Sequence, residues 1–218
     1  MKPTRAQRVV VTLLAVAIAT LSTLSTSAAK PPSGDDIIRK VQKTYEKMDT
    51  FSATFRQEFQ WGLAGETEVS QGTMLLAGDD RFLYQTDHQV IACDGNTLWR
   101  YNTGSDQAIV ENAAEADPGS LPRDFLFDFP KQFNVASVDQ IGEDVYELSL
   151  SPKQQGMGVS DVTVTIDGTR WITQRISFRD DAGNQTVYQL TDVEMNVKLE
   201  DSRFQYTPPE SATVFDLR

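Results

Sequence analysis

Apolar side chains recur at every second position of residues 51–61, which is the period of a β-strand with one dry face and one wet face. The even positions are polar or charged. The odd positions are Phe51, Ala53, Phe55, Gln57, Phe59 and Trp61. Gln57 is therefore the one polar residue on a face with four aromatic rings. A small sheet needs fewer rings for packing alone, so we expect the rest of the chain to curve a sheet around this face.

An amphipathic helix is predicted just before this strand. From Asp36, apolar residues recur at spacings of three and four, while Arg and Lys residues cover the opposite face. The apolar positions are Ile37, Val41, Tyr45 and Met48. We expect a helix of about a dozen residues that ends near residues 49–50.

Alternating segments separated by turn residues fill most of the remaining chain. They predict strands at 66–77, 81–85, 90–93, 98–102, 108–110, 133–141, 145–150, 159–166, 172–178 and 186–199. A last edge strand is expected at Phe204–Tyr206, stopped by Pro208 and Pro209. Gly72, inside the second strand, predicts a bulge or bend that lets the sheet curve.

The segment Leu121–Phe129 breaks this pattern, because it is a dense apolar run that ends at Pro130. We expect it to be a helical flap over an apolar space; the alternative is a helix that seals the open end of an ordinary barrel. The fold class predicted from all these patterns is mainly β with α, a curved antiparallel sheet or partial barrel with helices on its concave side.

Residues 1–29 have the pattern of a secretory signal peptide, with a basic start, an apolar middle and small residues before the expected cleavage after Ala29. The alternative is a retained membrane anchor, but the apolar run is short for a span and contains hydroxyl residues. No cysteine follows the apolar run, so an acylated-cysteine anchor is not expected. Residues 30–218 are then a single domain.

Removing those 29 residues leaves 189, with 17 Lys and Arg against 31 Asp and Glu, a net charge of −14. A chain this acidic is repelled by nucleic acid and by anionic membrane surfaces. Cys93 and His88 are each the only residue of their type. One cysteine forms no internal disulfide, and one histidine without a cysteine pair gives a zinc site almost no support. We expect Cys93 to be a small buried apolar residue, and we expect no cofactor.

Acidic pairs offer an enzymatic alternative, a secreted hydrolase with two carboxylates. The pairs are Asp35-Asp36, Asp79-Asp80 and Asp180-Asp181. Adjacent residues in a turn point apart, so solvated turns and caps explain these pairs better. What remains is a large aromatic and aliphatic interior in a small exported protein, which indicates a carrier of apolar ligands rather than an enzyme.

A series of motifs resembles the periplasmic outer-membrane lipoprotein carrier family (LolA). The motifs occur in order over nearly the whole mature chain: Phe51-x-Ala53-x-Phe55-x-Gln57, Gly72-x-Met74, Asp94-Gly95-x-x-Leu98-Trp99-x-Tyr101, Leu150-x-Pro152, Asp181-x-Gly183-Asn184-x-Thr186 and Phe204-x-Tyr206-x-Pro208-Pro209. The resemblance implies a half-open barrel with short helices forming a lid over a hydrophobic cavity. It also implies a periplasmic, monomeric carrier of acylated lipoproteins. The implied partners are an inner-membrane ABC transporter, which releases the lipoproteins, and an outer-membrane receptor lipoprotein.

On this resemblance we expect the acyl-chain cavity to be lined by Phe51, Phe55, Gln57, Phe59, Trp61, Met74, Leu76, Phe82, Tyr84, Ile91, Trp99 and Tyr101. The expected lid residues are Leu121, Phe125, Leu126 and Phe129, together with Arg81. We expect Phe125 and Phe129 to pack against Phe55, Phe59 and Trp99 in the empty form. The same fold in a sensor that binds lipids or lipoproteins is the alternative function.

Arg81 and Gln57 are each expected to have a particular role. The family usually has an Arg-Pro pair tied to lid closure before the strand at 81–85, and this chain has no Pro there. Either Arg81 takes that role from a shifted position, or it is a solvated residue at a strand end. Gln57 is expected to meet the ester or amide end of the bound lipid.

Overall fold

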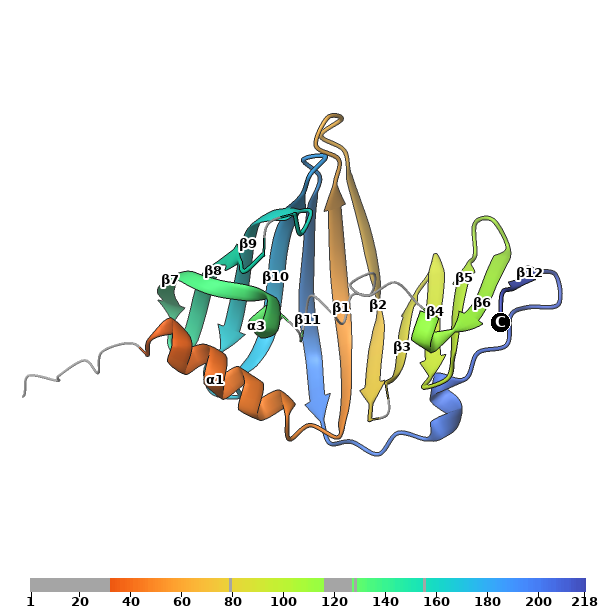
Figure 1. Cartoon of the computed structure of the whole chain (residues 1–218), viewed down its shortest axis with the longest axis horizontal. Helices are drawn as coiled ribbons and strands as arrows, with labels where there is room; N and C mark the ends of the chain where they lie inside the picture. Colours follow the sequence, from red (N-terminus) through yellow and green to blue (C-terminus); the bar gives the residue numbers. More distant parts are fainter. Residues whose placement is uncertain (1–31, 79, 116–126, 128, 155) are drawn as a thin grey trace, which may run out of the picture. The chain divides into compact units, whose positions relative to one another are not determined.

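Twelve strands form one sheet in the computed structural model, which describes residues 32–78, 80–115, 127, 129–154 and 156–218 (Figure 1). The strands are β1 (Thr50–Gln60), β2 (Thr67–Ala77), β3 (Arg81–Thr86), β4 (Gln89–Asp94), β5 (Thr97–Asn102), β6 (Gln107–Asn112), β7 (Phe133–Gly142), β8 (Val145–Pro152), β9 (Val159–Asp167), β10 (Ile172–Asp180), β11 (Gln185–Met195) and β12 (Thr213–Asp216). Their order is β12-β6-β5-β4-β3-β2-β1-β11-β10-β9-β8-β7, so the aromatic strand β1 lies in the middle of the sheet.

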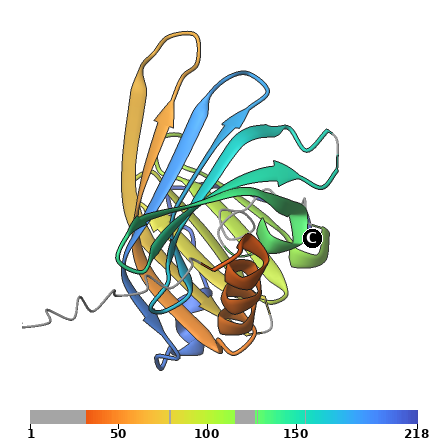
Figure 2. The ribbon, with the colours of Figure 1, turned by 90° about the vertical axis from the view of Figure 1, so that its left-hand side faces the viewer.

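The sheet curves around the helices that cover its concave face (Figure 2). No pairing joins the two outermost strands, β7 and β12, within the described residues, so the barrel is incomplete. The helical elements are α1 (Gly34–Tyr45), α3 (Phe129–Gln132) and the short 3-10 turns η1 (Ala113–Glu115) and η2 (Asp201–Phe204). The predicted fold class, a half-open barrel with helices on its concave side, is confirmed.

Helix α1 begins at Gly34, two residues before the predicted Asp36, and ends at Tyr45, four residues before the predicted end near 49–50; its apolar stripe faces the sheet. The Ser33 side chain caps it by accepting a hydrogen bond from the Asp36 backbone N–H. Ile37 and Val41 are fully buried. Tyr45 is the last helical residue, and its hydroxyl donates to Thr173 Oγ1 at 2.8 Å and accepts from the Thr173 backbone N–H at 2.8 Å. These two bonds fix the end of α1 to strand β10.

Two apolar clusters lie on opposite faces of the sheet, as the alternation of strand side chains requires. The larger one lies on the concave face and joins β1–β4 to β8–β11 and α1. The smaller one lies on the convex face, where Phe204 of η2 packs against residues of β2, β3 and β4. Cys93 is buried in the larger cluster, as predicted for a small apolar residue.

The end of the chain differs from the prediction in both place and direction. The segment Phe204–Tyr206 is not a strand, because Phe204 closes η2 and is fully buried on the convex face. Pro208 and Pro209 have no backbone N–H to donate to a ladder. The last strand is instead β12, which pairs parallel to β6. It is the one parallel pair among the described strands.

Gly72 has a different role from the predicted bulge. The register of β2 is continuous on both sides, and Phe55 lies directly opposite Gly72. A Cβ atom at Gly72 would lie 2.7 Å from Phe55 Cζ and 2.0 Å from the Gln85 backbone oxygen. Gly72 therefore makes room for the Phe55 ring. The irregularity of β1 is elsewhere, between Ser52 and Thr54 in its pairing with β11.

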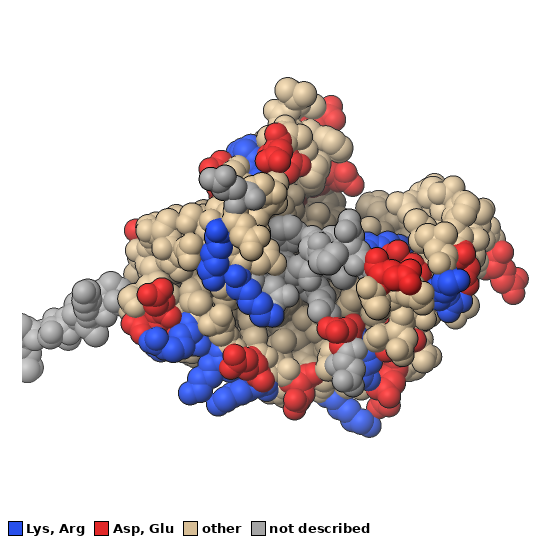
Figure 3. All heavy atoms as spheres, viewed as in Figure 1, with Lys and Arg blue, Asp and Glu red and all other residues tan. Residues whose placement is uncertain are grey.

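Basic side chains gather along α1, although the chain as a whole is acidic (Figure 3). The exposed basic residues of this segment are Arg39, Lys40, Lys43 and Lys47. Lys40 lies over the Trp171 ring, with its Nζ 3.9 Å from the ring centroid. Among the described residues, no helix is both long and apolar enough to cross a membrane.

Candidate functional site

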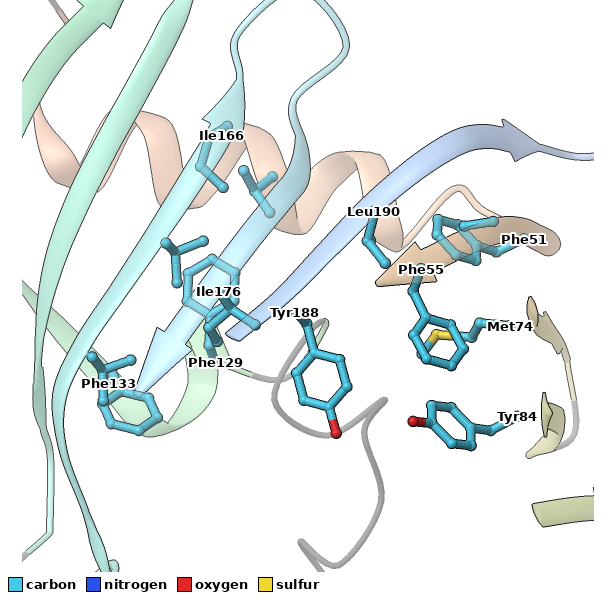
Figure 4. Close-up of a cluster of buried hydrophobic side chains, with 14 of the residues drawn as sticks. Phe51, Phe55, Met74, Tyr84, Phe129, Phe133, Ile166, Ile176, Tyr188 and Leu190 are labelled. Carbon is cyan, nitrogen blue, oxygen red and sulfur yellow. The ribbon is translucent and has the colours of Figure 1, made fainter. Parts of the chain in front are cut away.

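The concave face of β1 and its neighbours forms an aromatic surface at the centre of the molecule (Figure 4). Phe55 is fully buried, and its ring stacks on Tyr84 of β3 with centroids 4.5 Å apart. Tyr188 of β11 approaches the same ring from the other side, with centroids 6.3 Å apart. The pairing of β1 with both β2 and β11 therefore surrounds Phe55 with apolar side chains from both halves of the sheet.

Most of the predicted cavity residues lie together on this face. Buried members of the concave cluster are Phe51, Phe55, Met74, Phe82, Tyr84 and Ile91. Leu76 is half-buried against the same cluster. Gln57 and Phe59 are half-buried further along β1, toward the β1–β2 hairpin. The predicted aromatic face is thus dry at its Phe51 end and becomes more accessible toward the hairpin.

Trp61 lies outside this cluster. Strand β1 ends at Gln60, and the Trp61 side chain is 48% exposed beside the hairpin turn. Its ring meets the Phe59 ring edge to face, with centroids 4.8 Å apart. The expectation that Trp61 lines a buried cavity is therefore wrong, because the period-two pattern continues one residue beyond the end of the strand.

Trp99 and Tyr101 lie on the opposite, convex face, so their assignment to the cavity is also wrong. The register of β4 with β5 places Trp99 opposite Ala92 and Leu98 opposite Cys93. Leu98 and Cys93 belong to the concave cluster, whereas Ala92 belongs to the convex one. Strand alternation then directs Trp99 outward. The prediction that lid residues contact Trp99 in the empty form is wrong for the same reason.

Arg81 is on the convex face too, away from the helices that cover the cavity. Its Nη1 donates to Asp201 Oδ1 at 2.5 Å, its Nε donates to the Gly78 carbonyl at 2.9 Å, and its guanidinium lies over the Phe204 ring. Arg81 therefore holds η2 on the back of the sheet. The prediction that it contributes to lid closure is wrong, because its neighbour Phe82 occupies the inward position.

The concave surface is covered by α1, by Phe127 and by α3. Phe127 packs edge to face on Phe51 and on Tyr45, with centroids 5.0 Å and 4.9 Å apart. Phe129 is fully buried in the concave cluster, as predicted for a lid residue that packs onto this face. The other predicted lid residues, Leu121, Phe125 and Leu126, lie outside the described residues.

A pocket of about 390 Å³ opens between these covering elements and the end of the sheet. It is lined by α1 and its C-terminal turn, by the end of β2, and by the covering segment; the lining residues include Tyr45, Met48, Leu76, Phe127 and Lys131. The pocket therefore lies between these covering residues and the end of β2.

Burial affects the ionisation of three tyrosines on this surface. Desolvation raises the pKa of Tyr45 to about 12 and that of Tyr84 to about 12. Burial raises the pKa of Tyr188 as well, and the neighbouring Tyr84 hydroxyl adds to that shift. These hydroxyls therefore stay neutral at ordinary pH and act as hydrogen-bonding groups rather than as charges.

The acidic pairs considered for hydrolysis serve as caps and turns. Asp36 bonds to Ser33 and Arg39 at the start of α1. Asp180 accepts hydrogen bonds from the Asn184 backbone N–H and side chain, which lower the pKa of its carboxyl group. Asp79 lies outside the described residues. Within the described part of the chain, no group of His, Cys, Asp or Glu side chains is placed to hold a metal ion.

Sequence reasoning missed the contribution of the second half of the sheet. Tyr188 and Leu190 of β11 and Ile176 of β10 all belong to the concave cluster. The sequence did contain a signal for these residues, because Tyr188 and Leu190 lie on the same face of a strand with period-two alternation. Their position beside β1 depends on the pairing of the first strand with the eleventh, which no local pattern reveals.

Comparison with known proteins identifies the family to which this chain belongs. The family model described as outer membrane lipoprotein carrier protein LolA matches residues 46–207. The chain belongs to the LolA family. The resemblance inferred from the ordered motifs is thus confirmed, and the matched region runs from the end of α1 to just beyond η2.

Curated LolA-family relatives are distant but match over nearly their whole length. An outer-membrane lipoprotein carrier protein of Salmonella typhi is 27% identical over 210 residues, covering 94% of this chain and 98% of the relative. Its counterpart in Salmonella paratyphi A is 26% identical with the same coverage. An uncharacterised conserved protein of Thermus thermophilus has a solved structure with the same fold, at a TM-score of 0.54 and 14% identity, covering 85% of this chain and 99% of that one.

Proposed function

We propose that this protein is a periplasmic carrier that binds the acyl chains of lipoproteins on its concave surface and transfers them to a receptor at the outer membrane. The observation that carries the proposal is the covered aromatic surface around Phe55, in a chain of the LolA family. Relatives named lipoprotein carriers align with almost the whole chain, which supports the same role. The cargo is held without catalysis.

The shape of the site suits a long apolar ligand. Residues of both halves of the sheet contribute to one continuous cluster under α1 and α3. Each methylene group that leaves water contributes about 0.8 kcal/mol, so one long acyl chain contributes roughly 10 kcal/mol before any cost is subtracted. A carrier that kept all of this free energy would release its cargo too slowly.

The covering residues provide the cost that moderates binding. Phe127 occupies the space above Phe51 and Tyr45, so an acyl chain must displace it to reach the aromatic surface. The lost aromatic contacts are subtracted from the gain of burying the chain. The two states, covered and loaded, then differ less in free energy, and transfer in either direction becomes possible.

The proposed route has two partners. An inner-membrane ABC transporter supplies the acylated protein, and a receptor lipoprotein at the outer membrane accepts it. Both partners are implied by the family rather than by a contact in this chain. The expected export of the mature chain, which has a net charge of −14, agrees with a soluble intermediate between two membranes.

Depletion of the protein tests this function. If it carries lipoproteins, their amount in the inner-membrane fraction rises as the protein is lost and falls in the outer-membrane fraction. Restoring the wild-type gene must reverse both changes. An unchanged distribution between the membranes contradicts the carrier proposal. A change only in envelope stress signalling would favour the lipid or lipoprotein sensor of the same fold.

A further inference from the structure

The concave face changes from apolar to polar along three neighbouring strands, with Thr86 level with Gly72 and Phe55, and Gln57 level with Ser70. Toward the β1–β2 hairpin, the inward residues change from Phe55 to Gln57 on β1, from Met74 to Ser70 on β2, and from Tyr84 to Thr86 on β3. The register places Gln57 directly opposite Ser70 on one side and Tyr188 on the other. Gln57, Ser70 and Thr86 therefore form a polar band on β1–β3 beside the aromatic surface.

A recess of about 230 Å³ lies against this band. It is lined by Gln57, Phe59, Glu68, Ser70, Thr86, His88, Gln89 and Asn102. Gln57 belongs both to the recess and to the polar band. The side chains of β1 near the hairpin are only half-buried, so water reaches the recess from that end. It has room for a small polar group next to the buried rings.

Gln57 is oriented by its neighbours. Its Oε1 accepts a hydrogen bond from the Tyr84 hydroxyl at 2.9 Å and a longer one from Ser70 Oγ at 3.3 Å. The side-chain amide has two N–H donors besides this oxygen. No hydrogen bond from these donors to another described residue is present, so they are available to an acceptor in the recess.

The tyrosine hydroxyls strengthen this arrangement. Tyr84 and Tyr188 are 2% and 7% exposed, and Figure 4 shows both hydroxyls directed toward the space beside Phe55. Burial raises the pKa of both, so both remain neutral. The Tyr84 hydroxyl donates its proton to Gln57 Oε1, which leaves the two N–H groups of the Gln57 amide as the donors for the carbonyl oxygen of an ester or an amide.

The charge of the side chains that line the recess limits the class of ligand that it can bind. Its one charged lining residue among those described is the carboxylate of Glu68, and neither Lys nor Arg lines it. A phosphate group near Glu68 would meet a like charge and no Lys or Arg to compensate it, and His88 is the one lining side chain that can carry a positive charge. A neutral ester or amide would meet no such penalty.

We propose that this recess binds the ester and amide carbonyls at the acylated cysteine of a lipoprotein, with Gln57 as the donor and the acyl chains running from it toward Phe51. The inference rests on the proposed carrier function and gives the cargo a direction in the site. Phospholipids share the ester carbonyls but add a phosphate, so the recess favours lipoproteins over phospholipids.

Two synthetic lipopeptides test the carbonyl contact without altering the protein. One is a triacylated cysteine peptide with ester-linked chains, and the other is its ether-linked analogue, which lacks the ester carbonyl oxygens. The wild-type protein should bind the ester form about fivefold to tenfold more tightly, the effect of one net hydrogen bond. Equal affinity for the two ligands would overturn the assignment.

Variants then locate the contact. Gln57→Leu should bind both lipopeptides with equal affinity, because it removes the donor while keeping a side chain of similar size. Gln85→Leu is the matched control, since it makes the same change on the exposed outer side of β3, next to Tyr84. The control should keep the wild-type preference for the ester form. If Gln57→Leu keeps that preference too, Gln57 is not the donor.

A third ligand separates lipoproteins from lipids. Phosphatidylglycerol presented in the same assay should bind the wild-type protein at least tenfold more weakly than the ester lipopeptide. Glu68→Gln should reduce this difference. Equal wild-type binding of both ligands would overturn the selectivity, whereas binding of neither would count against the carrier function itself.

Discussion

Phe127 is the side chain on which the covered state depends most directly. It contacts Phe51 of the sheet and Tyr45 of the helix, so it joins two layers that would separate on cargo entry under the proposed carrier function. Two aromatic pairs of this kind contribute about 0.5–1.5 kcal/mol each beyond the area that they bury. This contribution exists only while the site is empty.

Phe127→Ala should therefore tighten the binding of an acylated lipopeptide and slow its release. If the lost contacts contribute about 1.4 kcal/mol to the covered state, affinity rises about tenfold. The dissociation rate of a fluorescent triacylated lipopeptide measures this. Phe215→Ala is a suitable control, because it removes the same ring from the exposed edge strand β12. Faster release from Phe127→Ala than from wild type would contradict the role of this ring.

The raised pKa values of two tyrosines predict how the free energy of unfolding changes at alkaline pH. Their pKa values in the folded protein are raised, to about 12 for Tyr45 and Tyr84, whereas unfolding returns them to about 10. Below pH 10 both states keep the protons. Between pH 10 and 12 the unfolded state loses protons that the folded state keeps, so the free energy of unfolding falls with pH.

Each such tyrosine contributes a slope of about 1.4 kcal/mol per pH unit above pH 10. Urea unfolding at pH 8, 9, 10 and 11 measures the total. Tyr45→Phe should reduce the slope above pH 10 by about one tyrosine's share while lowering stability at pH 8, because it also removes the bonds to Thr173. A slope identical to wild type would show that Tyr45 is not protected from ionisation.

At the scale of the element, strand β2 depends on a glycine for its contact with β1. The Phe55 ring lies over Gly72, where a Cβ atom would be 2.0 Å from the Gln85 carbonyl oxygen. Gly72→Ala should lower the free energy of unfolding by about 1–3 kcal/mol, the usual cost of an overpacked core. Gly78→Ala is the control, because no heavy atom lies within 4 Å of its added Cβ. Equal stability of the two variants would contradict this account of Gly72.

The elements show which parts of the fold a local pattern can predict. Period-two alternation located β1 and β2 to within a residue. In β1 the alternation coincides with burial only at Phe51, Ala53 and Phe55, and in β2 only Met74 and Leu75 are buried. It did not give the face of β5, where Leu98, Trp99 and Tyr101 are all large and apolar. The choice there depends on the partner: Leu98 is opposite buried Cys93, and Trp99 meets the convex cluster under η2.

The strand predicted at Phe204–Tyr206 was wrong for a related reason. Phe204 and Tyr206 alternate as a strand would, but both pack on a convex cluster that consists of residues distant in sequence. Arg81 lies a few positions after the place of the family's Arg-Pro pair, which suggested a lid role as one of two alternatives, and its partner Asp201 lies 120 positions further along the chain. Long-range partners decided each of these positions, and sequence spacing contains no information about them.

At the scale of the whole molecule, the sheet combines three surfaces that suit the amphipathic cargo of the proposed function. The concave face provides an apolar floor around Phe55, the covering residues Phe127 and Phe129 close it, and the polar band at Gln57 borders it. The convex face is separately closed by η2 and Arg81. An incomplete barrel leaves the concave side able to open without breaking the sheet.

Native mass spectrometry of the protein purified from the periplasm tests the central claim most directly. A carrier should be recovered partly as a one-to-one complex whose added mass equals that of an acylated lipoprotein. Phe127→Ala should increase the fraction of this complex. Recovery of the protein only in an empty form, or only with phospholipid bound, would contradict the claim that its concave surface carries lipoproteins.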